Sequence, residues 1–180
     1  MNKKRCFIIL IALLIISSYG FLFISRSKIS NENYSIKNKH GIAIQDNVLN
    51  VLCTVNDARK DLSGSNISKL YRYYWQFNEF TKLDDLPQSL ALYSINIRND
   101  YGELIKLSEN NSSQEEIKKI NANLELELSK YQTALSLIMK ECSANDYIKF
   151  YSLCSEGNTN ATMKSVIKIL TEDDKVSNRK

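Results

Sequence analysis

Turn-forming residues are scarce in this chain of 180 residues, which contains one proline and five glycines. A β-sheet protein needs many tight turns, and such turns are rich in both residue types. The scarcity argues against a sheet, and the helical periodicities described below favour an all-α fold.

Groups for common catalytic and ligand-binding chemistry are also scarce. His40 is the only histidine, and it lies in a polar stretch ahead of the main apolar patterns. Imidazole acid–base catalysis, His-paired nucleophiles and histidine zinc sites therefore lack material. The sequence has no glycine-rich phosphate loop and no C-x-x-C pair. We expect no enzymatic activity, no metal and no cofactor.

Most of the chain has no excess of basic over acidic residues, although the net charge of the whole chain is +4. Residues 1–39 carry seven basic residues and one acid, a balance of +6, and subtracting this from +4 leaves −2 for residues 40–180. The main body is thus slightly acidic, which argues against a nucleic-acid partner. The basic segment 26–39 suits an anionic lipid surface better.

One long uncharged run is present, from Cys6 to Ile24. Its 19 residues would span roughly 28 Å as a helix, close to the ~30 Å hydrocarbon core of a bilayer. The basic residues at 3–5 precede it, so the positive-inside rule predicts a cytoplasmic N-terminus and a domain on the periplasmic or extracellular side.

A cleaved signal peptide is the alternative for this run, and it would yield a secreted protein. Ser18 and Gly20 are small enough to precede a cleavage site. The chain continues directly into Phe21-Leu22-Phe23-Ile24, however, so a cleaved product would begin with four apolar residues. This continuation favours an uncleaved transmembrane anchor.

Beyond residue 40, apolar residues recur at helical spacing. A heptad seam of Ile44, Val48, Val51, Val55, Ala58 and Leu62 predicts the first bundle helix, with Leu49 and Leu52 widening its apolar stripe. Ser113-Gln114-Glu115-Glu116 has the spacing of a capping box and predicts the start of the longest helix. Shorter patterns follow around 147–154 and 160–171.

The predicted organisation is an antiparallel bundle of three to four long helices, preceded by the transmembrane or signal helix and followed by short helices. Its expected boundaries are residues 1–5 as a cytoplasmic N-terminal region, 6–24 as the anchor or signal, 25–40 as a polar tether, 41–172 as the bundle and 173–180 as a flexible tail.

A second predicted helix carries the densest aromatic run. At 100° per residue, one arc contains six apolar residues expected in the core: Ile67, Leu70, Tyr73, Tyr74, Phe77 and Phe80. Tyr71 and Trp75 fall outside that arc, one turn apart. They either pack against another helix of this chain or form a partner-binding hot spot, since tyrosine and tryptophan dominate interface energetics.

The chain has four cysteines. In an oxidising compartment we expect Cys142 and Cys154, twelve residues apart, to form a disulfide that contributes ~3 kcal/mol. Cys53 would then be a buried thiol, a partner for one of the other two, or an intermolecular bridge. Cys6 lies at the cytoplasmic edge of the predicted anchor.

The functional expectation is a membrane-tethered extracytoplasmic helical module that binds another protein, as an inhibitor, immunity factor or assembly partner would. A ligand-sensing bundle that acts through a membrane partner is the alternative. An envelope hydrolase using paired carboxylates is less favoured, because no pair is singled out. Heptad spacing also permits self-association.

Overall fold

The computed structural model describes residues 3–62, 66–110, 112–142, 146–155 and 160–172, with side chains described from residue 17 onward. The predicted flexible tail at 173–180 lies outside the described residues. Of the predicted cytoplasmic segment at 1–5, residues 1–2 lie outside them, and residues 3–5 are described as helix without their side chains.

Every element in this part of the chain is an α-helix, which confirms the predicted all-α class. The helices are α1 (Lys3–Asp61), α2 (Ile67–Phe80), α3 (Gln88–Glu109), α4 (Gln114–Glu141), α5 (Tyr147–Ser155) and α6 (Ala161–Thr171).

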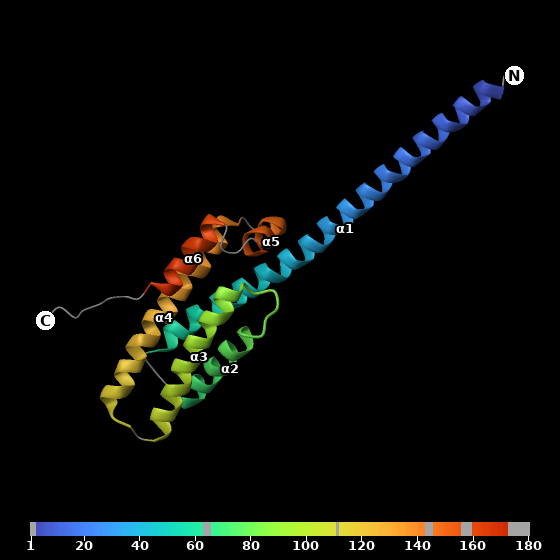
Figure 1. Ribbon diagram of the computed structural model, residues 1–180. Coiled ribbons are helices and arrows are strands. Elements are labelled where there is room, and N and C mark those ends of the chain that lie inside the picture. Colours follow the sequence, from blue (N-terminus) through green and yellow to red (C-terminus); the bar gives the residue numbers. More distant parts are fainter. Residues whose placement is uncertain (1–2, 63–65, 111, 143–145, 156–159, 173–180) are drawn as a thin grey trace.

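The last third of α1 forms a four-helix bundle with α2, α3 and α4 (Figure 1). α2 and α3 form a hairpin, α4 packs against α3 and α1, and α1 also contacts α2. The two short helices cover the outside of this bundle, with α5 along α1 and α6 along α4. The N-terminal part of α1 extends away from the bundle as a single rod (Figure 1).

The segment predicted as a polar tether, residues 25–40, is helical. It belongs to α1, which continues without a break from Lys3 to Asp61. Its side chains are exposed apart from Ser25 and Asn38, which are half-buried. The lack of an apolar period indicated a largely exposed segment, but it did not exclude a helix, because an exposed helix needs no apolar face.

Within the residues searched, no helix is long and apolar enough to cross a lipid bilayer. The transmembrane prediction therefore gains no support. Much of the predicted anchor, from Cys6 to Ile16, lies outside the residues whose side chains are described.

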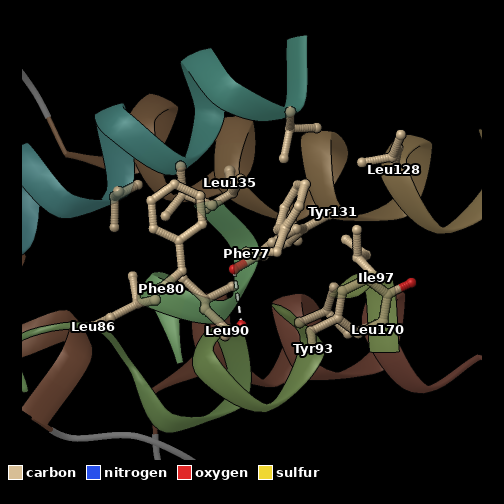
Figure 2. Packing of buried hydrophobic residues seen from close by; sticks show 14 of the residues in the cluster. Phe77, Phe80, Leu86, Leu90, Tyr93, Ile97, Leu128, Tyr131, Leu135 and Leu170 are labelled. Carbon is tan, nitrogen blue, oxygen red and sulfur yellow. Dashed lines mark hydrogen bonds between the residues drawn. The ribbon is translucent and has the colours of Figure 1, made fainter. Parts of the chain in front are cut away.

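The bundle core contains the predicted heptad seam of α1. Ile44, Val48, Val51, Val55 and Ala58 are all buried. Leu52 is half-buried and Leu49 is 44% exposed, so the widened stripe was partly wrong. Figure 2 shows how residues from α2, α3, α4 and α6 interlock beneath α1. Among those labelled are Phe77, Phe80, Leu90, Ile97, Tyr131, Leu135 and Leu170.

A buried polar network lies inside this core. The Tyr131 hydroxyl donates to the backbone carbonyl of Leu90 at 2.8 Å, and the Ser94 hydroxyl lies 2.9 Å from the Tyr131 oxygen. Ser94 also bonds the Leu90 carbonyl at 3.2 Å. Burial raises the pKa of Tyr131 well above its usual range. Because each polar group has a partner, the network joins α3 to α4 without an unsatisfied hydroxyl.

Two helix starts follow their sequence signals. Ser113 caps α4, since its Oγ accepts from the Glu116 backbone N–H at 3.3 Å, as the capping-box spacing predicts. The Asn160 side chain accepts from the backbone of Thr162 and Met163 and caps α6. These local bonds fix where each helix begins.

The predicted disulfide between Cys142 and Cys154 is not formed, since both are free thiols in the structure. α5, which carries Cys154, packs along α1, and both cysteines lie against the apolar core. Burial raises the pKa of Cys142 to about 11 and that of Cys154 to about 12. Both are therefore protonated and weakly nucleophilic at neutral pH. Cys53 is an exposed free thiol, rather than the buried one considered above.

Candidate partner-binding surface

The helix α2 divides its aromatic residues between the core and the outside. Leu70, Tyr73, Phe77 and Phe80 are buried, as predicted. Tyr74 is half-buried, and Ile67 is 40% exposed, so its assignment to the core was wrong. Ile67 is the first residue of α2, where the bundle ends and fewer neighbours can cover a side chain.

Tyr71 and Trp75 lie on the outer face of α2, with 40% and 57% of their surfaces exposed. No helix in the described part of the chain covers them fully. They are thus not sealed between two helices of this chain, although Tyr71 contacts the end of α3. Trp75 presents more than half of its large side chain to solvent.

Local contacts hold the two aromatic side chains in place. The Trp75 indole meets the Tyr74 ring edge to face, with ring centres 5.5 Å apart. The Tyr71 hydroxyl donates to the Glu109 carboxylate at 2.7 Å, and this bond raises the pKa of Tyr71. Glu109 is the last residue of α3, so the bond also connects the two helices of the hairpin.

A groove of about 570 Å³ lies between α2 and α3 beside these residues. Tyr74, Gly102 and Leu107 contribute apolar surface, while Asn99, Glu103 and Lys106 supply polar groups. Gly102 allows the Tyr74 ring to approach the α3 backbone: a Cβ added there would lie 3.3 Å from Tyr74 Cε2. Tyr74 lines the groove and its ring contacts Trp75. The groove and the aromatic pair are therefore treated together as the α2–α3 face, defined by Tyr71, Tyr74, Trp75, Gly102 and Leu107.

Ion pairs at the far end of α1 position α2. The Asp61 carboxylate accepts from Lys69 Nζ at 2.7 Å, Tyr73 Oη at 2.7 Å and Arg72 Nη2 at 3.1 Å. The bonds from Lys69 and Tyr73 lower the pKa of Asp61. Burial and the bond to Asp61 raise the pKa of Tyr73 to about 12. Three donors from α2 thus meet one acceptor on α1, which fixes the rotation of α2 about its axis.

A second clamp joins α1 to the α2–α3 connection and to α5. His40 Nδ1 lies 2.8 Å from Asp85 Oδ1, and the His40 ring is 6.2 Å from the Tyr151 ring centre. The only histidine of the chain thus has a structural partner. Asp85 lies shortly before α3, which begins at Gln88 directly after Pro87.

A small cavity adjoins the ion pairs of Asp61 and offers little space for a ligand. Asp61, Tyr73, Tyr101 and Asn121 line it together with apolar side chains, and its volume is about 10 Å³, which is room for one water. Tyr101 Oη and Asn121 Oδ1 are buried there without a protein partner among the described residues.

No cluster of three or more His, Cys, Asp or Glu side chains in the described residues could hold a metal ion. The acidic group with the most altered protonation is half-buried Asp100, on α3. Burial raises its pKa to about 6, and nearby Glu127 and Glu103 act in the same direction, whereas the Asn123 hydrogen bond opposes it. Asn123 donates to Asp100 at 2.8 Å, which makes this a contact between α3 and α4.

Sequence reasoning identified Tyr71 and Trp75 but missed the groove beside them. Gly102 was the available signal, because glycine inside a helix costs stability and often marks a close approach. Which residue approaches it could not be known before the register of α2 against α3 was known.

Comparison of this chain with protein-family models, curated proteins and solved structures gives no match.

Proposed function

We propose that this chain is a membrane-tethered, extracytoplasmic helical module that binds another protein and carries out no catalysis of its own. The α2–α3 face is the proposed binding surface, and residues 6–24 with their basic flanks are the proposed lipid anchor. The observation that carries the binding proposal is the exposure of Trp75 beside Tyr71 and a groove, in a bundle whose other described aromatic side chains are buried or half-buried.

The shape of this surface suits protein binding better than capture of a small molecule. The groove is flanked by rigid aromatic side chains, and its rim carries charges of both signs from Glu103 and Lys106. Interfaces have this arrangement of an aromatic centre with a polar rim. The small cavity beside Asp61 gives the ligand-sensing alternative no comparable support.

A site-specific crosslinking experiment tests the binding surface. A photoreactive amino acid at Trp75, in the intact chain expressed in its native cells, is expected to crosslink one protein reproducibly. The same amino acid at Leu92, an apolar α3 residue with 55% exposure, provides the matched control. Equal crosslinking from both positions would mean that simple exposure, rather than this face, determines contact.

Affinity measurements with the captured protein then follow. Trp75→Ala should weaken binding by about 2 kcal/mol, or roughly 30-fold, and Tyr71→Ala by less, since its hydroxyl is engaged with Glu109. Leu92→Ala should leave the affinity unchanged. If Trp75→Ala binds as tightly as the native chain, the proposed surface is wrong.

Topology is tested separately. A reporter fused after Lys180 is expected outside the cytoplasm, and the chain should stay in the membrane fraction after carbonate extraction. A cytosolic reporter would overturn the localisation. Release of the chain by carbonate would favour the secreted alternative.

A further inference from the structure

The part of α1 at residues 17–40, here called the stalk, extends away from the four-helix bundle (Figure 1). Its last residues meet the rest of the chain, since Lys37 and His40 lie beside Tyr151 of α5 and His40 also contacts Asp85. The stalk is rich in serine and asparagine, which are weak helix formers. The Lys28–Glu32 ion pair, at 4.0 Å and well exposed, adds little. A helix of this composition is marginal by itself in water and gains stability from a partner.

Three large aliphatic residues recur along the stalk at intervals of seven. Leu22, Ile29 and Ile36 are 57%, 57% and 52% exposed. Because seven residues make almost two helical turns, these side chains form one stripe. With this stripe at heptad position d, position a is occupied by Tyr19, Arg26 and Asn33.

Charges beside the stripe match a second copy in parallel orientation. Glu32 occupies position g and Lys37 occupies position e. In a parallel, in-register pair, position g of one chain faces position e of the following heptad in the other. Glu32 of each copy would therefore face Lys37 of its partner, and both contacts are attractive.

Asn33 adds specificity to the same arrangement. A single asparagine at position a fixes register and favours two strands at some cost in stability. Arg26 opposes association, because two arginines would meet at position a, but its long side chain can turn outward. The seam is short, so alignment of two copies by a common lipid surface would strengthen it through effective concentration.

The bundle does not occupy this stripe. At 100° per residue, Ile29 and Ile36 lie about 60–80° around α1 from the centre of the buried seam between Ile44 and Ala58. Lys37 Nζ lies 6.0 Å from the centre of the Tyr151 ring of α5, so it must turn away from that ring to reach Glu32 of a second stalk.

We propose that the stalk is a dimerisation surface, and that a second copy of this chain pairs with it as a parallel, in-register coiled coil through Leu22, Ile29 and Ile36. The proposal goes beyond the proposed function and uses neither the α2–α3 face nor any partner of that face. Of the three stripe residues, Leu22 falls within the proposed lipid anchor at residues 6–24, whereas Ile29 and Ile36 lie beyond it.

Cysteine crosslinking of the intact chain in dodecyl maltoside micelles tests orientation and register. Cys6 and Cys53 are first replaced by serine, and Ile29→Cys, Ile36→Cys or the control Asn31→Cys is added. Asn31 lies opposite the stripe. Under mild oxidation we expect covalent dimers with Ile29→Cys and with Ile36→Cys, at least tenfold more than with Asn31→Cys. Equal yields at all three positions, or crosslinks only when the Ile29→Cys and Ile36→Cys chains are mixed, would overturn a parallel pair.

Charge exchange tests the partner's identity with native apolar residues in place. Glu32→Lys and Lys37→Glu, each alone, should shift the sedimentation equilibrium toward monomer by at least tenfold in dissociation constant. An equimolar mixture should restore dimers, since each chain then supplies the charge that the other lacks. Dimerisation that is unchanged in the single variants, or not restored by mixing, would refute the proposal. Circular dichroism of each variant checks that the bundle remains folded.

Discussion

Replacement of Gly41 by alanine, which adds one methyl group, should displace α5 from α1. Gly41 is buried in α1, where the N-terminus of α5 crosses it. A Cβ added at Gly41 would overlap the Tyr147 carbonyl oxygen and lie only 2.5 Å from its carbonyl carbon. These are backbone atoms, so no change of side-chain rotamer relieves the overlap, and α5 must move by about 1 Å or more to restore ordinary contact.

The size of the effect follows from opposing contributions. Glycine to alanine inside a helix normally stabilises it by about 1 kcal/mol. Overpacking costs about 1–3 kcal/mol, and displacement of α5 would also expose Phe150 and Leu153, which are buried, at up to about 1.5–3 kcal/mol each. We expect Gly41→Ala to lower the free energy of unfolding by about 2–4 kcal/mol.

Urea denaturation followed by circular dichroism measures this loss, and the reactivity of Cys154 with a thiol reagent reports on α5 directly. Gly102→Ala is the matched control, because its Cβ would meet only the edge of the Tyr74 ring, at 3.3 Å. That variant should stay within about 1 kcal/mol of the native chain. A Gly41→Ala protein as stable as the Gly102→Ala protein, with Cys154 still protected, would refute the docking of α5 described here.

Three further outcomes are expected. Burial raises the pKa of Asp100 to about 6 in the folded state. The contribution of Asp100 to the free energy of unfolding is therefore fully present below the unfolded pKa near 4 and is lost as the pH rises through about 6. After allowance for solvent screening, Asp100→Asn should raise the free energy of unfolding by about 1 kcal/mol at pH 7 and should flatten its pH dependence between pH 4 and 6, as measured in urea titrations. Tyr131→Phe should cost about 1 kcal/mol in the same assay by removing the bond to the Leu90 carbonyl, and no loss would mean that Ser94 replaces it. Mass spectrometry after brief maleimide treatment should find Cys53 labelled first, because Cys142 and Cys154 have raised pKa values; faster labelling of Cys154 would contradict its burial.

Local and periodic sequence signals predicted the positions and buried faces of several helices correctly. The heptad seam of α1, the Ser113 capping box and the aromatic arc of α2 each depend on residues within a few turns of one another. Their chemistry is therefore visible along the sequence. The same angular argument placed Tyr71 and Trp75 outside the α2 core arc, but it left open whether another helix of the chain covers them.

Contacts between distant segments could not be predicted in this way. The His40–Asp85 bond, the approach of Tyr147 to Gly41 and the groove at Gly102 depend on helix register and on which helix covers which face. The helical backbone of residues 25–40 could not be predicted for a related reason. Polar composition indicated exposure correctly, but it carried no information on whether the backbone of an exposed segment continues the helix that follows it.

Because α1 is continuous, the orientation of the bundle depends on the exact number of residues in the part of α1 that precedes it. Each residue added to or removed from positions 25–40 would turn everything downstream by about 100° and shift it by about 1.5 Å along the axis. A flexible connection would absorb such a change, whereas this rod passes it on. A single deletion would therefore rotate Trp75 about the α1 axis, whereas a seven-residue insertion would leave its orientation almost unchanged and would only move it along the axis.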